Sequence, residues 1–204
     1  MNAQEPEKLF EDYLTLHGLK YQRDLLVSGK GNVDFHIQSD SHTILCDVKE
    51  IRDSIQKDDC ELNAYINIRN DINKLRKKFG QNRPDLPCVL VSMNFSSSFF
   101  TGLTVARAML GDVGVYFDKE SKQIISPVRH LPSGNARMTE NQNRTISGVL
   151  VFDRAGNYHC LFTNPFAEHP VPDGFFPNVQ VVLLTKDSLC SQMQNLPNLI
   201  FWNV

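Results

Sequence analysis

Two short segments in which apolar and polar residues alternate constrain the fold of this chain most. Residues 33–38 read VDFHIQ and residues 44–49 read ILCDVK. Alternation with a period of two indicates a strand with one buried face. The residues between the two segments, SDSH at 39–42, are rich in turn formers. We therefore predict two antiparallel strands joined by a tight turn at residues 40–41.

This hairpin would bring two acidic side chains together. If residues 40 and 41 form a two-residue loop, residue 39 pairs with 42 and Asp34 lies opposite Asp47. Opposed residues have Cβ atoms about 4.5–5.5 Å apart, and Lys49, two residues further on, points to the same side as Asp47. A bulge in the turn would change this register. Opposed carboxylates destabilise a sheet unless a cation neutralises them, so the register predicts a metal site.

The segments around the hairpin predict an α/β fold. Residues 7–14 have the pattern of an amphipathic helix, and residues 19–27 follow as a strand. A longer helical pattern covers about 55–79, and a nearly continuous apolar run, 88–93, is typical of a central strand that is parallel to its neighbour. The predicted order is therefore a helix, three meandering strands, a helix and a strand.

These residues resemble a known enzyme family. An aspartate at the start of one strand, here Asp34, and an Asp-x-Lys sequence ending the next, here 47–49, are similar to the motif of the PD-(D/E)XK nuclease superfamily. The resemblance covers about 5–95. Asn32-Val33 precedes Asp34, where many family members have a proline. The resemblance implies a restriction endonuclease-like core and the hydrolysis of phosphodiester bonds.

The resemblance also implies a set of metal ligands. Asp34 and Asp47 would bind one or two Mg²⁺ or Mn²⁺ ions, and the backbone carbonyl of Val48 would be a further ligand. Glu7 on the first helix would complete the coordination shell, directly or through water. Glu11, one helical turn later, is the alternative helix acid.

Lys49 would orient or activate the attacking water and offset charge on the phosphate. A lysine can act as a fixed cation, or as a base when burial lowers its pKa, and both roles stay open. The expected activity is that of a Mg²⁺-dependent endonuclease, with DNA the favoured substrate over RNA. Asp-x-Lys also occurs on ordinary charged surface strands. The alternative function is a non-catalytic nucleic-acid-binding or assembly module that retains the fold.

A basic cluster at the end of the second helix is the candidate substrate-binding surface. It contains Lys74, Arg76, Lys77 and Lys78. Basic side chains in the last turn also complement the helix dipole, which gives the cluster a purely structural alternative. The formal net charge of the chain is −2. Because nucleic-acid-binding domains are usually strongly basic, any phosphate contacts would have to be local.

The second half of the chain predicts a helix at about 99–110 and an extension of the sheet. Strand-like segments cover 113–117, 124–126, 146–152, 158–162 and 179–184. The polar stretch 127–144 has no apolar periodicity and contains several cationic side chains, so it would contact a nucleic-acid backbone or be disordered. We expect one domain over 1–204, with the core at 5–95 and an extension at 96–204.

Composition places the chain among soluble cytoplasmic proteins. The N-terminus has no apolar signal core, and no apolar run approaches the ~20 residues of a membrane span. The five cysteines are widely spaced and form no Cys-x-x-Cys pair, which favours a reducing compartment. The expected partner is nucleic acid. The oligomeric state stays open, with a homodimer as one option.

Overall fold

The computed structural model describes residues 5–27, 31–39, 42–52, 60–79, 85–95, 101–114, 116, 118–123, 125–126, 129–130, 135–153, 159–185 and 187. Within these residues it contains three helices and nine strands. In chain order they are α1 (Glu5–Leu16), β1 (Lys20–Val27), β2 (Gly31–Ser39), β3 (His42–Ile51), α2 (Cys60–Phe79), β4 (Cys88–Asn94), α3 (Gly102–Leu110), β5 (Val113–Gly114), β6 (Arg129–His130), β7 (Ile146–Asp153), β8 (His159–Thr163) and β9 (Gln180–Val182).

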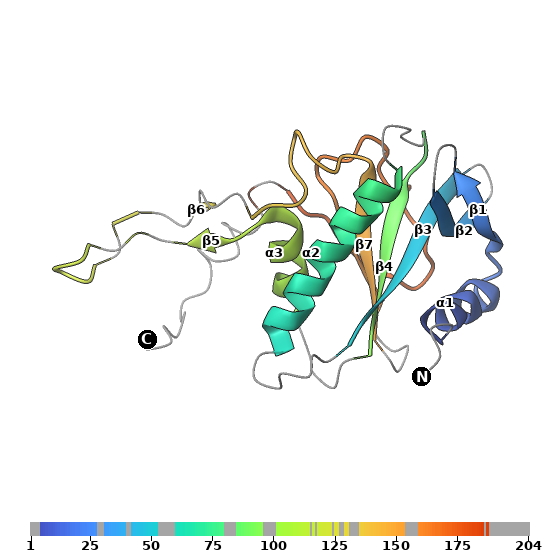
Figure 1. Ribbon diagram of the computed structural model, residues 1–204, viewed down its shortest axis with the longest axis horizontal. Helices are drawn as coiled ribbons and strands as arrows, with labels where there is room; N and C mark the ends of the chain where they lie inside the picture. The colour runs from blue at the N-terminus through green and yellow to red at the C-terminus, as the bar shows by residue number, and fades with distance from the viewer. Residues whose placement is uncertain are drawn as a thin grey trace.

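Seven of the strands form one mixed sheet in the order β1-β2-β3-β4-β7-β8-β9 (Figure 1). The first three strands form an antiparallel meander. The pairs β3·β4, β4·β7 and β8·β9 are parallel, whereas β7·β8 is antiparallel. The predicted α/β class and the predicted element order are confirmed. The central, parallel position of β4 and the extension of the sheet by C-terminal strands are confirmed as well.

The register of the β2–β3 hairpin is the predicted one as far as the two strands pair. Ser39 pairs with His42, and the ladder continues to Phe35 opposite Cys46. The turn residues 40–41 lie outside the described residues. Residue 34 would be the next partner of residue 47, but the main-chain ladder ends one step before this pair. The two strands therefore separate at the position of the two aspartates.

Apolar side chains cover both faces of the sheet. On one face, Phe10, Tyr13 and Leu14 of α1 pack over alternate residues of β2, β3 and β4. On the other face, α2 and α3 pack over the remaining residues of the same strands (Figure 1). Strand β4 is buried at every position except its last. A continuous apolar strand is expected to have this double cover because neither of its faces can be left to water.

Part of the second half differs from the prediction. Strand β5 pairs with β6 in a separate two-stranded sheet, so it does not extend the main sheet. Residues 125–126 lie opposite Tyr116 but form no regular strand. There the Ser126 hydroxyl, in place of a backbone carbonyl, accepts the bond from the Tyr116 amide at 2.8 Å. A side-chain acceptor interrupts the ladder, which explains why alternation alone overestimated the strand.

The described part of the stretch 127–144 is packed against the protein. The backbone amides of Arg137 and Met138 donate to the carbonyl of Met109 at the end of α3, at 2.9 and 2.8 Å. Met138 is buried in the core on the α2 side. The alternative of disorder is therefore wrong for residues 135–144, where one methionine and its backbone bonds hold a mostly polar segment in place.

The long helix is described from Cys60 onward. The pattern predicted a helix over about 55–79, and α2 covers Cys60–Phe79, while residues 53–59 lie outside the described residues. Among the described residues, no helix is both long and apolar enough to cross a membrane.

Candidate active site

The fork between β2 and β3 is held together by a side chain. At the point where the main-chain ladder ends, the backbone amide of Val48 donates a hydrogen bond to Asp34 Oδ2 at 2.7 Å. Beyond this point β3 continues alone beside β4, with Asp47 paired to Leu90. The carboxylate of Asp34 thus satisfies an amide that has lost its strand partner, and this bond points the carboxylate toward β3.

Asp34 and Asp47 contact the same two ammonium groups. Lys49 Nζ lies 2.7 Å from Asp47 Oδ2 and 3.8 Å from Asp34 Oδ2. Lys78, from α2, forms a close ion pair with Asp47 Oδ1, and its Nζ lies 3.6 Å from Asp34 Oδ1. The side chain of Asp47 is only 1% exposed, so its charge must be balanced by groups within the protein. The two aspartates therefore converge on one side of the sheet.

The ammonium of Lys49 lies among the atoms that the resemblance assigns to a metal ion. Besides its contacts with the two carboxylates, Lys49 Nζ donates a hydrogen bond to the carbonyl of Val48 at 3.0 Å. Carboxylate oxygens of Asp34 and Asp47 and this carbonyl oxygen thus surround one positive centre. The arrangement shows that the three groups can share a single cation.

The protonation of this centre is set by burial and by neighbouring charges. Burial and then the nearby Asp47 charge raise the pKa of Asp34, although the Val48 amide and both lysines oppose this shift. Burial alone would lower the pKa of Lys49, but Asp47 and Asp34 outweigh it and hold that pKa above its ordinary value. Lys49 is therefore a cation in this arrangement.

The helix acid Glu7 lies at the edge of the site. Its carboxylate forms a close ion pair with Arg23 of β1. Partial burial and then the charge of Asp34 raise the pKa of Glu7, which places the two acids within electrostatic reach. Glu11 instead accepts a hydrogen bond from Tyr21 at 2.8 Å. Of the two candidate helix acids, Glu7 is thus the one whose pKa is raised by the charge of Asp34, whereas Glu11 is hydrogen-bonded to Tyr21.

The structure divides the predicted basic cluster. Lys78 enters the site and neutralises both aspartates. Lys74 instead pairs with Asp71 at 2.7 Å and is largely exposed. Arg76 and Lys77 are exposed on the outside of α2. Among the ion pairs between described residues, none involves Arg76 or Lys77, so both are available for a surface contact of the predicted kind.

Two buried polar residues next to the site were missed by the sequence interpretation. Asp71 is buried on α2, and its charge acts on Lys49. Its spacing from Lys74 and Lys78, three and seven residues, puts all three on one side of the helix and could have indicated it. Ser92 pairs with Lys49 across β3 and β4, and its buried hydroxyl has no hydrogen-bond partner among the described residues. The sequence around Ser92 is an apolar strand with a single serine, and this pattern does not indicate that the serine lies beside a charged site.

The donor set fits a hydrated divalent ion and not a cage made of protein alone. Among the described residues, no three acidic, histidine or cysteine side chains lie close enough to hold a metal by themselves. Mg²⁺ is commonly bound by one or two carboxylates together with water and substrate phosphate. The buried Asp47 Oδ2 accepts no aligned hydrogen bond from the described residues, in spite of its ion pair with Lys49. That oxygen, Asp34 and the carbonyl of Val48 would hold such an ion.

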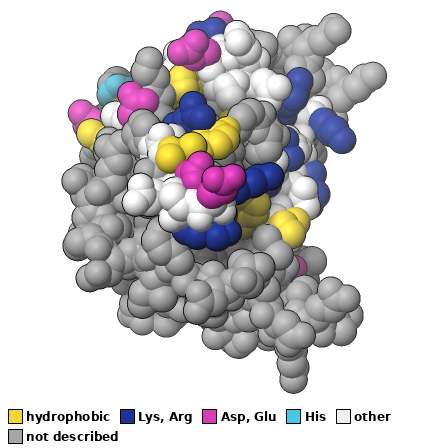
Figure 2. All heavy atoms as spheres, turned by 90° about the vertical axis from the view of Figure 1, so that its left-hand side faces the viewer, with side chains coloured by type: hydrophobic (Ala, Val, Ile, Leu, Met, Phe, Trp, Pro, Cys, Tyr) yellow, Lys and Arg dark blue, Asp and Glu magenta, His cyan; other side chains and the backbone are white. Residues whose placement is uncertain are grey.

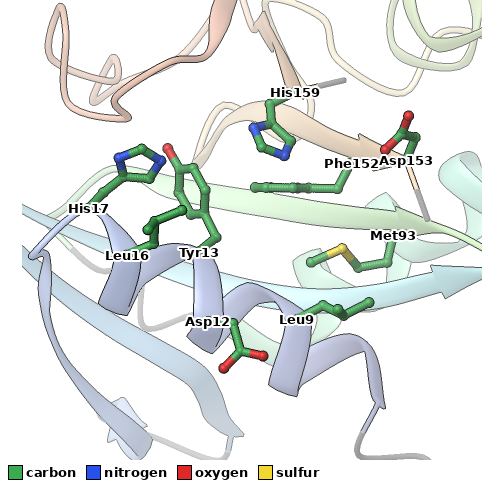
Figure 3. A pocket seen from close by; sticks show the side chains of 9 residues that line it. All are labelled: Leu9, Asp12, Tyr13, Leu16, His17, Met93, Phe152, Asp153 and His159. Carbon is green, nitrogen blue, oxygen red and sulfur yellow. The ribbon is translucent and has the colours of Figure 1, made fainter. Parts of the chain in front are cut away.

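A pocket of about 200 Å³ lies on the opposite face of the sheet, beside α1 (Figure 3). Its lining is mainly apolar and aromatic, with the ring of His159 4.3 Å from that of Phe152. Tyr13 of α1 and His17, one residue past the end of α1, lie side by side, with ring centroids 4.7 Å apart. None of the predicted site residues lines this pocket. It is therefore separate from the fork.

No protein-family model matches this chain, and neither a curated protein nor a solved structure matches it. A function for the fork must therefore be argued from the geometry and chemistry of its residues.

Proposed function

We propose that this chain is a metal-dependent nuclease that hydrolyses phosphodiester bonds at the fork between β2 and β3. The order α1, three-strand meander, α2 and β4 supports a restriction endonuclease-like core over about 5–95. The convergence of the Asp34 and Asp47 carboxylates with the carbonyl of Val48, next to Lys49, supports the assignment of the motif. The convergence of Asp34 and Asp47 on one ammonium centre carries the proposal, because a site that holds one cation between these oxygens can hold another.

Each residue at the fork has a distinct part in the proposed reaction. Asp34, Asp47 and the carbonyl of Val48 would hold Mg²⁺, with Glu7 acting through water from the edge of the site. When bound, the ion would supply Lewis acidity and lower the pKa of a bound water. Lys49, kept charged by its carboxylate neighbours, would stabilise the negative charge that builds up on the phosphate.

Lys78 has a different part in this scheme. Its ammonium forms ion pairs with one oxygen of each aspartate, so it competes with a divalent ion for the same carboxylates. Metal binding would release Lys78 toward the substrate, where it would become a phosphate contact. Lys78 thus remains a proposed substrate-binding residue, and its availability for the substrate would depend on metal binding.

DNA is the proposed substrate, because the resemblance favours it over RNA. The exposed residues Arg76 and Lys77 on α2 are the remaining candidates for contacts with the phosphate backbone. Such contacts give affinity without sequence specificity and weaken as salt rises. Binding through this surface would accordingly be strongest at low ionic strength.

Cleavage assays test the proposal directly. The purified chain should nick or cut supercoiled plasmid in Mg²⁺ or Mn²⁺, and EDTA should abolish the activity. Asp47→Asn and Lys49→Ala should each lose it. Asp173→Asn and Lys119→Ala change the same residue types at exposed positions and should retain it. Cleavage that survives in Asp47→Asn, or that is equally lost in the control variants, would refute the proposal.

One observation favours a non-catalytic module as the second candidate. Two lysines balance the two aspartates, so the ion-pair network is electrically complete without a metal. A ligand that binds only the folded state must raise stability. If Mn²⁺ leaves the thermal unfolding of the wild type unchanged and neither duplex nor single strands are cut, the fork serves as a structural ion-pair network of a binding or assembly module.

A further inference from the structure

A second charged cluster lies where α2, α3 and the segment 135–145 meet. We define the arginine cluster as Arg69 of α2, Arg107 of α3, Arg137 and the carboxylate of Asp112. Asp112 accepts hydrogen bonds from Arg107 and Asn135 at 2.9 Å and from the Tyr65 hydroxyl at 3.0 Å. The guanidinium groups of Arg69 and Arg107 also lie over the ring of Tyr65, 4.9 and 5.4 Å from its centroid.

Within the described part of the chain, the charges of the arginine cluster are not balanced. Arg107 forms an ion pair with Asp112 at 2.9 Å. Arg69 instead donates to two neutral groups, the Tyr65 hydroxyl at 2.7 Å and the Asn135 amide oxygen at 3.3 Å. Among the described residues, neither Arg69 nor Arg137 has a carboxylate within ion-pair distance. Among the described residues, the cluster thus contains three guanidinium groups and one carboxylate, which leaves an excess of two positive charges.

Two of these guanidinium groups also have unused hydrogen-bond donors. The Nε atoms of Arg69 and Arg137 are buried and have no hydrogen-bond partner in the described part of the chain. A buried donor that has lost its water and gained no acceptor costs about 1–3 kcal/mol, and more when the group is charged. Burial and then the positive charge of Arg69 lower the pKa of Arg137. The cluster therefore has the donors and the charge of a site whose acceptor is an anion.

We propose that the arginine cluster binds a phosphate group. Guanidinium groups present planar pairs of donors that match phosphate oxygens, which makes arginine the preferred residue for such recognition. A phosphate monoester carries close to two negative charges near neutral pH, which matches the excess in the cluster. Tyr65, Asn135 and Asp112 hold Arg69 and Arg107 in place, so the donors are positioned before the ligand arrives.

The cluster is reachable from solvent and separate from the fork. The side chain of Arg107 is 40% exposed, and Arg69 and Arg137 are half-buried. Figure 2 shows the end of the molecule to the left in Figure 1, where Lys and Arg side chains stand between Asp and Glu. Arg69 and Lys78 are nine residues apart on α2, so they lie on opposite sides of the helix, about 13.5 Å apart along its axis. This inference therefore does not depend on the nuclease proposal.

Calorimetric titration with inorganic phosphate, at constant ionic strength set by chloride, tests the inference. The wild type should bind saturably. Arg137→Gln should weaken binding by roughly tenfold or more, the loss expected for hydrogen bonds to a charged group. Lys119→Gln removes the same charge from an exposed turn and should bind as the wild type does. Titration in EDTA, where the proposed metal-dependent nuclease would be inactive, separates this result from the nuclease proposal.

A second variant and a second ligand complete the test. Arg69→Gln should weaken phosphate binding as Arg137→Gln does, so the inference stays testable if one variant fails to fold. A six-nucleotide DNA strand is titrated with and without a 5′-phosphate. Binding of the phosphorylated strand alone indicates a terminal phosphate as ligand, and binding of both strands indicates an internal phosphodiester. Either result supports the site if Arg137→Gln abolishes the binding. The inference is overturned if neither inorganic phosphate nor the strands bind, or if they bind equally to wild type and both arginine variants.

Discussion

The amide of Val48 and the carboxylate of Asp34 form a hydrogen bond of 2.7 Å that joins β3 to β2 just beyond the last paired residues of the hairpin. Asp34 Oδ2 accepts this bond, and Asp34 Oδ1 faces the ammonium of Lys78. The position of Asp34 is therefore fixed by the backbone of the strand that carries Asp47. Asp34 therefore has two roles: its hydrogen bond stabilises the fold, and its charge would bind the metal.

The two roles can be separated by substitutions at Asp34. Asp34→Asn keeps an oxygen that can accept the hydrogen bond from the Val48 amide, so its free energy of unfolding should fall little. Because the variant lacks the carboxylate charge, Mn²⁺ should no longer stabilise it. Asp34→Ala removes the acceptor and should cost a further 1–3 kcal/mol, roughly the penalty of an unsatisfied buried donor. Urea unfolding with and without Mn²⁺ measures both effects. Equal stability of the two variants would show that the hydrogen bond does not hold the fork.

Substitution of Lys78 tests its competition with a metal. Lys78→Gln removes an ammonium from both aspartates. In EDTA the variant should be less stable than the wild type, because Asp47 is buried and keeps Lys49 as its one counter-charge among the described residues. In Mn²⁺ its melting temperature should rise more than that of the wild type. Lys119→Gln is the exposed control, and a smaller rise in Lys78→Gln would contradict the competition.

The stability of the arginine cluster should depend on pH through Asp112. Burial acts to raise the pKa of Asp112, but hydrogen bonds from Asn135, Arg107 and Tyr65 outweigh it and hold the pKa below its ordinary value of 3.8. A carboxylate with a depressed folded-state pKa contributes stability above its unfolded pKa, and the contribution is lost as pH falls through the folded value.

Urea unfolding from pH 7 down to pH 3 measures this contribution. Asp112→Asn should lose about 1–3 kcal/mol at pH 7, as expected when a hydrogen-bonded charge is removed. The difference between the wild type and the variant should shrink only below about pH 4, where Asp112 of the unfolded chain takes up a proton while Asp112 of the folded protein is still ionised. A constant difference across this range would show that the pKa of Asp112 is not depressed.

Two glycines should respond differently to replacement by alanine. At Gly148 in β7 a Cβ atom would lie 2.6 Å from the carbonyl oxygen of Phe162, so the central sheet would have to shift. We expect a loss of about 1–3 kcal/mol, the usual cost of overpacking. At Gly18, after α1, φ is +66° and nothing lies within 4 Å, so only the backbone cost of about 1 kcal/mol applies. Thermal unfolding of both variants compares them.

The geometry of the hairpin could be predicted because local rules determine it. A two-residue turn and strict alternation fix which residues of β2 and β3 oppose each other, and a slip of one residue would reverse every side chain. The position of Asp34 relative to residues 47–49 follows from this rule alone. The end of the ladder at Phe35 did not follow, because it depends on the pairing of β3 with β4.

Contacts between distant segments could not be predicted. Lys78 reaches Asp47 across 31 residues, and this depends on how α2 docks on the sheet. In the sequence Lys78 is one of several basic residues at a helix end, where the dipole also favours them. The arginine cluster joins three segments in the same way, with Arg69 and Asn135 66 residues apart. Such sites emerge only from tertiary packing, because no short motif encodes them.

The double cover of the sheet also seals its thiols from solvent. Cys46, Cys88 and Cys160 are buried within it, and burial raises the pKa of Cys88 to about 12. A thiol with such a pKa is almost never ionised at neutral pH, and the thiolate is the form that reacts with alkylating reagents. The rate at which these three native sulfur atoms are alkylated would therefore report how often the helices separate from the sheet, with no engineered cysteine.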